Sequence, residues 1–235
     1  MTPEALVRGA GTRAAVPFVG EITLLMPDAP SDLWDIWSTS GRDDPPFWAY
    51  PWAGGQALAR YVLDNPETVR GRRVLDVASG SGLVAIAAAK AGAAGVVAGD
   101  IDPVAVAAIA VNAAANGVSV SARVFDLATG TMGDPTGTEA GTEAGTEAGT
   151  EAGTQVVLAA DVFYQRELAA VALAFLREAA TAGAQVLAAD PGRAFMPAAF
   201  FSPLARYQVP VSTVLEDRPV KDVTVYRLAN AAGPA

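Results

Sequence analysis

Five short apolar runs between Arg72 and Asp190 constrain the fold of this chain more than any other feature. The first is RRVLDVA, and the other four, VVAGD, SARVFD, VVLAAD and QVLAAD, each end in an aspartate. Continuous apolar runs of this length are typical of strands that are buried on both faces. Segments of helical character alternate with these runs, which predicts a parallel, doubly wound sheet. The aspartates at the carboxyl ends of such strands would lie along one sheet edge.

The end of the chain follows a different pattern. Two further strands are expected over Val209–Leu215 and Val223–Leu228, with a short charged loop between them. A loop of this length cannot carry a parallel crossover, so the two strands should form an antiparallel hairpin. The sequence therefore predicts an α/β fold with a seven-stranded, mostly parallel sheet. Its helices are expected at 56–63, 83–91, 102–116 and 167–180.

The N-terminal segment and one internal segment are less regular. Residues 1–45 are expected to form an arm with one strand (Glu21–Met26) and a short helix (Asp32–Trp37), ahead of a main domain over 46–235. Within this domain, residues 128–154 contain four TEAG units that have no apolar stripe. A glycine at every fourth position costs a helix about 1 kcal/mol each, so we expect a flexible, solvated loop.

Composition excludes several kinds of function. The chain contains neither cysteine nor histidine, which rules out disulfides, thiolate chemistry, Cys/His zinc sites and a Ser-His-Asp triad. The formal net charge of −9 argues against nucleic acid as a partner. No secretory signal is recognised and no apolar run reaches the roughly 18 residues of a membrane span. We therefore expect a soluble, cytoplasmic monomer with no membrane partner.

A glycine turn follows the first of the five strands. The stretch LDVASGSGLVAIAAA contains Gly80-x-Gly82-x-x-Ala85, which fits the loose dinucleotide-binding fingerprint of a Rossmann-like fold. Asp100 ends the next strand, 24 residues after Asp76, where a carboxylate can accept both ribose hydroxyls. The turn and Asp100 together predict a ligand that contains adenosine.

Asp76 indicates which adenosine ligand this is. A pyrophosphate over the helix N-terminus disfavours an acid in the turn, whereas a carboxylate suits the ammonium end of S-adenosylmethionine. We therefore favour S-adenosylmethionine over NAD, although Asp76 can also be a helix-capping acid. Asp126 ends the third strand, and receiving the adenine amino group or simply ending the strand are equally good interpretations. Asp102 is interpreted as the N-cap beside Pro103.

The chain resembles a known enzyme family at five places. These are PPFWAYPWAGGQALARYVLDNP, VLDVASGSG, GDIDPVAVAAIAVNAAANG, LAADVFY and DPGR. Together they resemble the class I, seven-stranded S-adenosylmethionine-dependent methyltransferases and, more narrowly, the lysine methyltransferases of the electron transfer flavoprotein β subunit. The resemblance covers residues 17–228. Ala78 departs from it where most methyltransferases have the first glycine, and the TEAG repeat is foreign to it.

The resemblance implies roles for the residues at the end of the fourth strand. It makes the D-x-x-Y element, Asp161 to Tyr164, the site of the substrate amine, with Ala160 against the cofactor. Asp161 can accept a hydrogen bond from the incoming ammonium, and Tyr164 can exclude water around it. Orientation and desolvation would supply most of the rate, since no dedicated general base is recognised. The alternative is that Asp161 caps the following helix and Tyr164 belongs to the core.

Two tryptophans and an arginine complete the predicted site. A tryptophan face suits an adenine ring or a cation, and the resemblance favours Trp52 for the cofactor while leaving Trp48 in the core. Arg193 is expected to shape the substrate mouth.

The resulting hypothesis is an N-methyltransferase that acts on a protein lysine, with the electron transfer flavoprotein β subunit or a similar protein as substrate. Its predicted cofactor-binding residues are Trp52, Asp76, Gly80, Gly82, Asp100, Asp126 and Ala160. Three alternatives stay open: a small-amine methyltransferase of the nicotinamide type, an NAD-dependent oxidoreductase, and a catalytically silent module that binds S-adenosylmethionine.

Overall fold

A computed structural model describes residues 2–29, 45–133 and 153–229, together with residues 32, 35 and 38. Its main sheet has the strand order β6-β5-β4-β3-β7-β8-β10-β9. The five central strands are parallel, and β6, β10 and β9 pair antiparallel with their neighbours. The strands are β3 (Arg73–Val77), β4 (Gly95–Asp100), β5 (Ser121–Asp126), β6 (Thr131–Gly133), β7 (Val156–Ala160), β8 (Gln185–Asp190), β9 (Phe201–Pro210) and β10 (Val220–Leu228).

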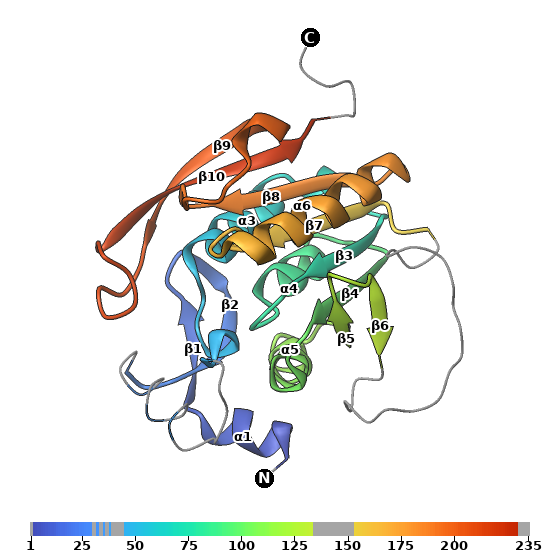
Figure 1. The fold of residues 1–235 in the computed structure, drawn as a ribbon. Coiled ribbons are helices and arrows are strands. Elements are labelled where there is room, and N and C mark those ends of the chain that lie inside the picture. The colour runs from blue at the N-terminus through green and yellow to red at the C-terminus, as the bar shows by residue number, and fades with distance from the viewer. Residues whose placement is uncertain are drawn as a thin grey trace.

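Helices cover both faces of this sheet (Figure 1). One core lies beneath α6, and a second core lies between the opposite face and the other three long helices. The predicted doubly wound α/β fold is therefore confirmed. The helices are α3 (Ala53–Asp64), α4 (Leu83–Lys90), α5 (Pro103–Ala115) and α6 (Arg166–Thr181), with single 3₁₀ turns at Phe47–Ala49, Pro66–Thr68 and Ala198–Phe200.

The C-terminal hairpin is antiparallel as expected, but its first strand lies earlier in the chain than predicted. The prediction placed it at Val209–Leu215, whereas β9 runs over Phe201–Pro210. This strand contains Pro203 and ends at Pro210. It is the edge strand of the sheet, and the register shifts opposite Val225 and Tyr226, beside Pro203. Edge strands and bulges are the positions where a sheet accepts proline.

The N-terminal segment is more regular than the sequence indicated. Helix α1 (Pro3–Gly9) has Thr2 as its N-cap, and β1 (Thr12–Val16) pairs antiparallel with β2 (Val19–Met26). Only the second of these strands was predicted, because four of the five residues of β1 are exposed and give no apolar alternation.

The N-terminal hairpin packs on α3, α4 and α5 and is fastened to α5 by asparagines. Asn112 accepts a hydrogen bond from the Leu25 amide at 2.9 Å and donates to the Ser81 carbonyl at 2.8 Å. Asn116 accepts from the Thr23 amide. The buried Asn112 thus joins the hairpin to the turn between β3 and α4.

Two predictions fall largely on residues that the structure does not describe. The helix expected over Asp32–Trp37, apart from Asp32 and Asp35, and the TEAG units up to residue 152 lie outside the described residues. The part of the predicted 128–154 loop that is described contains β6, which pairs with β5. Among the described helices, none is long and apolar enough to cross a membrane.

Candidate active site

A cleft of about 630 Å³ opens at the carboxyl edge of the parallel strands. The ends of β3, β4, β5 and β7 form its floor, and the segment before α3 forms one wall. A volume in this range fits a small molecule or cofactor. Eight of the nine predicted site residues line it, namely Trp52, Asp76, Gly80, Asp100, Asp126, Ala160, Asp161 and Tyr164.

The turn between β3 and α4 contains three residues in the left-handed region. Gly80 has φ +54° and Gly82 has φ +83°, while Ala78 adopts φ +49° despite its Cβ. Gly82, the ninth predicted residue, is not among the lining residues. A Cβ on Gly82 would lie 3.2 Å from the Cα of Ile109, so this glycine lets α4 approach α5 closely. Its effect on the cleft is indirect, through the position of the turn.

Asp76 is buried in the turn and bonds to the start of α4. Its Oδ2 accepts hydrogen bonds from the Ser79 hydroxyl and, at 3.1 Å, from the Ala85 amide in the first turn of the helix. The capping role considered from the sequence is therefore present, in a residue that also lines the cleft. The pKa of Asp76 is raised to about 7, mainly by burial and to a smaller extent by the neighbouring Asp100 carboxylate, while the hydrogen bonds from Ser79 and Ala85 oppose the increase.

Asp100 and Asp126 end β4 and β5 beside Asp76. Asp100 accepts from the Gly80 amide at 2.9 Å and from the Asp102 amide at 3.0 Å, and burial raises its pKa to about 6. Asp126 accepts from the Ala128 amide at 2.8 Å. We call Asp76, Asp100 and Asp126 the glycine-turn side of the cleft. All three carboxylates bond to nearby backbone amides, which fixes their direction.

Asp161 holds a conformation that is unusual for a residue with a side chain, with φ +55°. Its Oδ2 accepts a hydrogen bond from the Gly55 amide at 2.9 Å, in the first turn of α3. The alternative that Asp161 caps the following helix is not what the structure shows, because Gln165 occupies the N-cap of α6. A Cβ on Gly54 would lie 2.5 Å from this Oδ2, so α3 approaches Asp161 through a glycine.

Asp161 also faces a cation. Its Oδ1 lies 3.4 Å from Nη2 of Arg193, which is among the cleft-lining residues as well. Burial raises the pKa of Asp161 to about 6, although the Arg193 guanidinium opposes the increase. Asp190 and Glu216 are further acids whose charge raises it. We call Asp161, Tyr164 and Arg193 the β7 side of the cleft.

Aromatic rings line the wall between the two sides. Nε1 of Trp52 donates to the Phe47 carbonyl at 2.9 Å, and the rings of Phe47 and Tyr164 have centroids 5.7 Å apart. Phe47 is 42% exposed and Tyr164 is 38% exposed, so the pair lies at the mouth. Tyr164 is thus not a core residue. Trp48 packs in the core with α5, as predicted, and also reaches the cleft.

Sequence reasoning missed several contributors. Gly54 and Gly55 sit in a Gly-Gly pair at a helix start, which is a recognisable signal for a close approach. Phe47 could have been noted as an aromatic beside Trp48. Glu216 gave no local signal, because its neighbours along the chain carry no motif.

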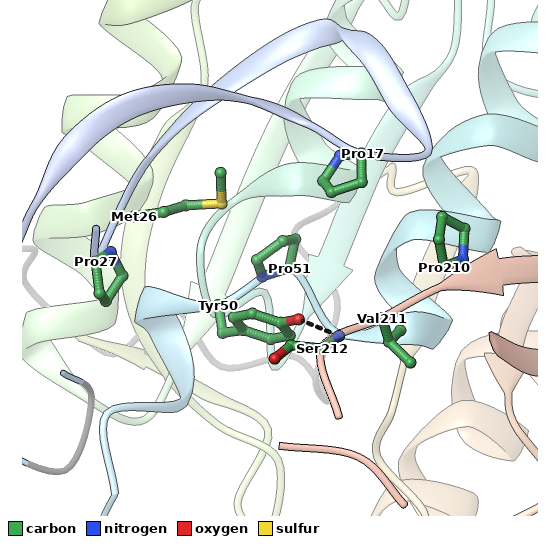
Figure 2. A pocket seen from close by; sticks show the side chains of 8 residues that line it. All are labelled: Pro17, Met26, Pro27, Tyr50, Pro51, Pro210, Val211 and Ser212. Carbon is green, nitrogen blue, oxygen red and sulfur yellow. Dashed lines mark hydrogen bonds between the residues drawn. The ribbon is translucent and has the colours of Figure 1, made fainter. Parts of the chain in front are cut away.

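A second, smaller cavity of about 340 Å³ lies beside the cleft (Figure 2). Its lining comes from the N-terminal hairpin, the segment before α3 and the loop after β9. Tyr50 and Pro51 line both cavities. The Tyr50 hydroxyl accepts a hydrogen bond from the Ser212 amide at 2.9 Å, which Figure 2 marks.

The fold and the site together define a class I S-adenosylmethionine-dependent methyltransferase, and the comparisons with known proteins agree. The family model described as ribosomal protein L11 methyltransferase (PrmA) matches residues 56–137. A Thermoplasma acidophilum protein of solved structure has a similar fold, with a TM-score of 0.52, 16% identity, and coverage of 76% of this chain and 89% of that chain.

Sequence similarity that extends over most of the chain identifies a particular family within this class of methyltransferases. The electron transfer flavoprotein β subunit lysine methyltransferase of Xenopus laevis is 36% identical over 220 residues, which cover 89% of this chain and 80% of that protein. The protein of the same name from Rattus norvegicus is 38% identical over 68% of this chain, and the match spans 54% of the rat protein. The chain belongs to this family of lysine methyltransferases.

Proposed function

We propose that this protein transfers methyl groups from S-adenosylmethionine to a lysine of the electron transfer flavoprotein β subunit or of a closely similar protein. The observation that carries this proposal is the 36% identity to the Xenopus laevis enzyme, which extends over both sides of the cleft. No feature of the described residues favours a small amine over a protein as acceptor. The two exposed aromatic rings at the mouth suit a protein substrate.

The glycine-turn side is the proposed cofactor site. Its donor set fits S-adenosylmethionine, because Asp100 can accept hydrogen bonds from the ribose hydroxyls, Asp76 can pair with the ammonium group and Asp126 can accept a hydrogen bond from the adenine amine. Trp52 and Ala160 complete the wall, while Gly80 and Gly82 shape the turn. When bound, S-adenosylmethionine supplies a methyl group on a sulfonium, which an amine attacks in line.

The β7 side is the proposed acceptor site. Asp161 is held by Gly55 from one direction and faces Arg193 from another, so its carboxylate is already oriented before a lysine arrives. A lysine ammonium beside it would be aligned and then has to lose a proton to become nucleophilic. The pKa of Asp161 is raised to about 6 but still lies well below the value of about 10.4 for a free lysine, so this carboxylate orients the ammonium rather than removing its proton. Tyr164 and Phe47 exclude water around the amine.

The proposal includes a cytoplasmic monomer without nucleic-acid or membrane partners. The net charge of −9 supports the first of these exclusions, since phosphate backbones attract basic surfaces.

The test is methyl transfer by the wild type and by Asp161→Asn. Asparagine tolerates positive φ and keeps an oxygen for the Gly55 amide, so this variant preserves the fold better than alanine would. We expect radiolabel in a lysine of the purified β subunit, a loss of about 100-fold or more in the variant, and unchanged affinity for S-adenosylmethionine. Labelling of nicotinamide or other small amines, with none in protein, would refute the proposal. So would equal turnover by the variant.

A further inference from the structure

The loop between β9 and β10, residues 211–219, returns from the far edge of the sheet to the β7 side of the cleft. Its first part is held by the hydrogen bond from the Ser212 amide to Tyr50 (Figure 2). Leu215 packs against the cluster that contains Trp48. The next residue, Glu216, is only 8% exposed although it belongs to a surface loop. A buried carboxylate in such a loop requires partners.

Arg193 is one partner of Glu216. Its Nη2 lies 3.5 Å from Oε1 of Glu216 and 3.4 Å from Oδ1 of Asp161. Charge-assisted N–H···O bonds usually measure about 2.7–2.9 Å, so the guanidinium makes only a long hydrogen bond to Asp161 and lies at nearly the same distance from Glu216. Among the described residues, Nε of Arg193 is buried and has no hydrogen-bond partner. Arg193 is therefore shared between Asp161 and Glu216.

Lys221 extends this network. Its Nζ lies 3.2 Å from Oε2 of Glu216 and also pairs with Asp217. The charges alternate along a line: Asp161, Arg193, Glu216 and Lys221. A change at one end of such a line alters how strongly Arg193 is drawn toward Asp161.

We propose that Glu216 is a positioning residue for methyl transfer, which draws Arg193 away from Asp161 and so keeps the Asp161 carboxylate available to the lysine of the substrate. This inference rests on the proposed function, because it concerns the same acceptor site. It extends that function to a residue 55 positions further along the chain, in a loop that does not line the cleft.

Competition for Asp161 gives the physical reason. The substrate ammonium and Arg193 are both cations that seek the same carboxylate. If Glu216 lost its charge, Arg193 would move closer to Asp161 and oppose the entry of the lysine. The charged groups that face Asp161 are Arg193, Asp190 and Glu216. Those that face Glu216 are Arg193 and Lys221, with the Tyr50 phenol nearby.

The first test compares Glu216→Gln with Asp217→Asn in the full chain. Both variants remove one negative charge from the same loop, but Asp217 is exposed and, among the described residues, its ion pairs are with Lys221 and Arg218 and not with Arg193. In Glu216→Gln we expect the carboxyl titration of Asp161, followed by NMR of ¹³C-labelled aspartate, to fall by about one pH unit. The KM for the protein substrate should rise by about tenfold, with little change in kcat. In Asp217→Asn both quantities should change far less, because Asp217 acts on Glu216 only through Lys221.

Lys221→Met provides a second variant, in which the titration midpoint of Asp161 should shift in the opposite direction. Without Lys221, Glu216 would attract Arg193 more strongly, and the titration midpoint of Asp161 should rise. Equal midpoints in Glu216→Gln and the wild type, or shifts of the same sign in Glu216→Gln and Lys221→Met, would overturn the inference. The NMR titration needs no substrate. Its outcome is therefore separate from whether the wild type methylates the β subunit, which tests the proposed function itself.

Discussion

The two sides of the cleft are built in different ways. On the glycine-turn side, Asp76, Asp100 and Asp126 bond to amides that lie 9, 20 and 2 residues away along the chain. On the β7 side, Asp161 bonds to an amide 106 residues away and to a guanidinium 32 residues away. The glycine-turn side is thus made from successive strand–turn–helix units, whereas the β7 side is assembled from segments that are distant along the chain.

The comparisons with known proteins cover the two sides to different extents. The PrmA model covers residues 56–137, which contain the whole glycine-turn side and end before Asp161. The Xenopus laevis lysine methyltransferase matches over 220 residues and so includes both sides. Local units that bind a common cofactor can recur with many acceptors. The acceptor itself should be determined by the long-range contacts of the β7 side.

The largest expected effect is a loss of methyl transfer in Gly54→Ala, a variant that should disturb the β7 side of the cleft and leave the glycine-turn side intact. In Gly54→Ala the new Cβ would lie 2.5 Å from Oδ2 of Asp161 and 2.9 Å from the Ala189 carbonyl, so Asp161 must move. We expect kcat/KM for methyl transfer to fall by about 100-fold, while the Kd for S-adenosylmethionine changes little. Steady-state kinetics and calorimetric titration measure these quantities.

Gly55→Ala is the matched comparison in the same helical turn. Its Cβ would meet only Cδ2 of Leu83, at 3.9 Å, and the amide that binds Asp161 would remain. Its loss of activity should be far smaller. Equal losses of activity in the two variants would mean that any added Cβ in the first turn of α3 impairs methyl transfer, whether or not it displaces Asp161.

Asp100→Asn is the corresponding test on the glycine-turn side of the cleft. Replacing this carboxylate weakens charge-assisted hydrogen bonds to a ligand, so the Kd for S-adenosylmethionine should rise by at least about tenfold. The KM for the protein acceptor, measured at saturating cofactor, should stay within about twofold because Asp100 lies on the other side of the cleft. A large change in the acceptor KM with an unchanged cofactor Kd would reverse the assignment of the two sides.

The pH dependence of stability should also distinguish the two sides. Burial raises the pKa of Asp76 to about 7 from 3.8, so the folded free enzyme holds a proton that the unfolded chain releases. The stability that this group contributes is fully present below about pH 4 and is lost as pH rises through about 7. Asp76→Asn should therefore show a smaller fall in Tm between pH 5 and 8, by about 5 °C.

The same measurement on Asp161→Asn provides the contrast. Burial also raises the pKa of Asp161, but only to about 6, because Arg193 partly compensates the buried charge. In this variant the slope of Tm against pH should therefore differ from the wild-type slope mainly below about pH 6.5, and the two curves should run parallel above it. Parallel Tm curves for the wild type and Asp76→Asn would show that Asp76 is ionised in the folded protein throughout this range.

Sequence reasoning was strongest where structure is local. The five apolar runs and the glycine turn predicted the parallel sheet, its helices and the edge where eight of nine chosen residues now line a cleft. Gly82 is the predicted residue that does not line the cleft; it packs against α5, and a local sequence motif does not reveal such a contact. Strand β9 was misplaced because an edge strand tolerates prolines that a central strand would not. Glu216 became visible only when the β9–β10 loop was placed beside Arg193.

The smallest predicted effect concerns Ala78, which lies in the turn between β3 and α4 and has a backbone conformation that alanine rarely adopts. Ala78 has φ +49°, where a Cβ costs about 1–2 kcal/mol, and part of the gain from glycine is offset by the greater freedom of the unfolded chain. Ala78→Gly should therefore increase the free energy of unfolding by about 1 kcal/mol, which corresponds to about 2–4 °C in Tm. The Kd for S-adenosylmethionine should fall slightly or stay unchanged, and acceptor kinetics should not respond. A lower Tm would show that the Ala78 methyl, which packs on the α6 core, contributes more than its backbone strain removes.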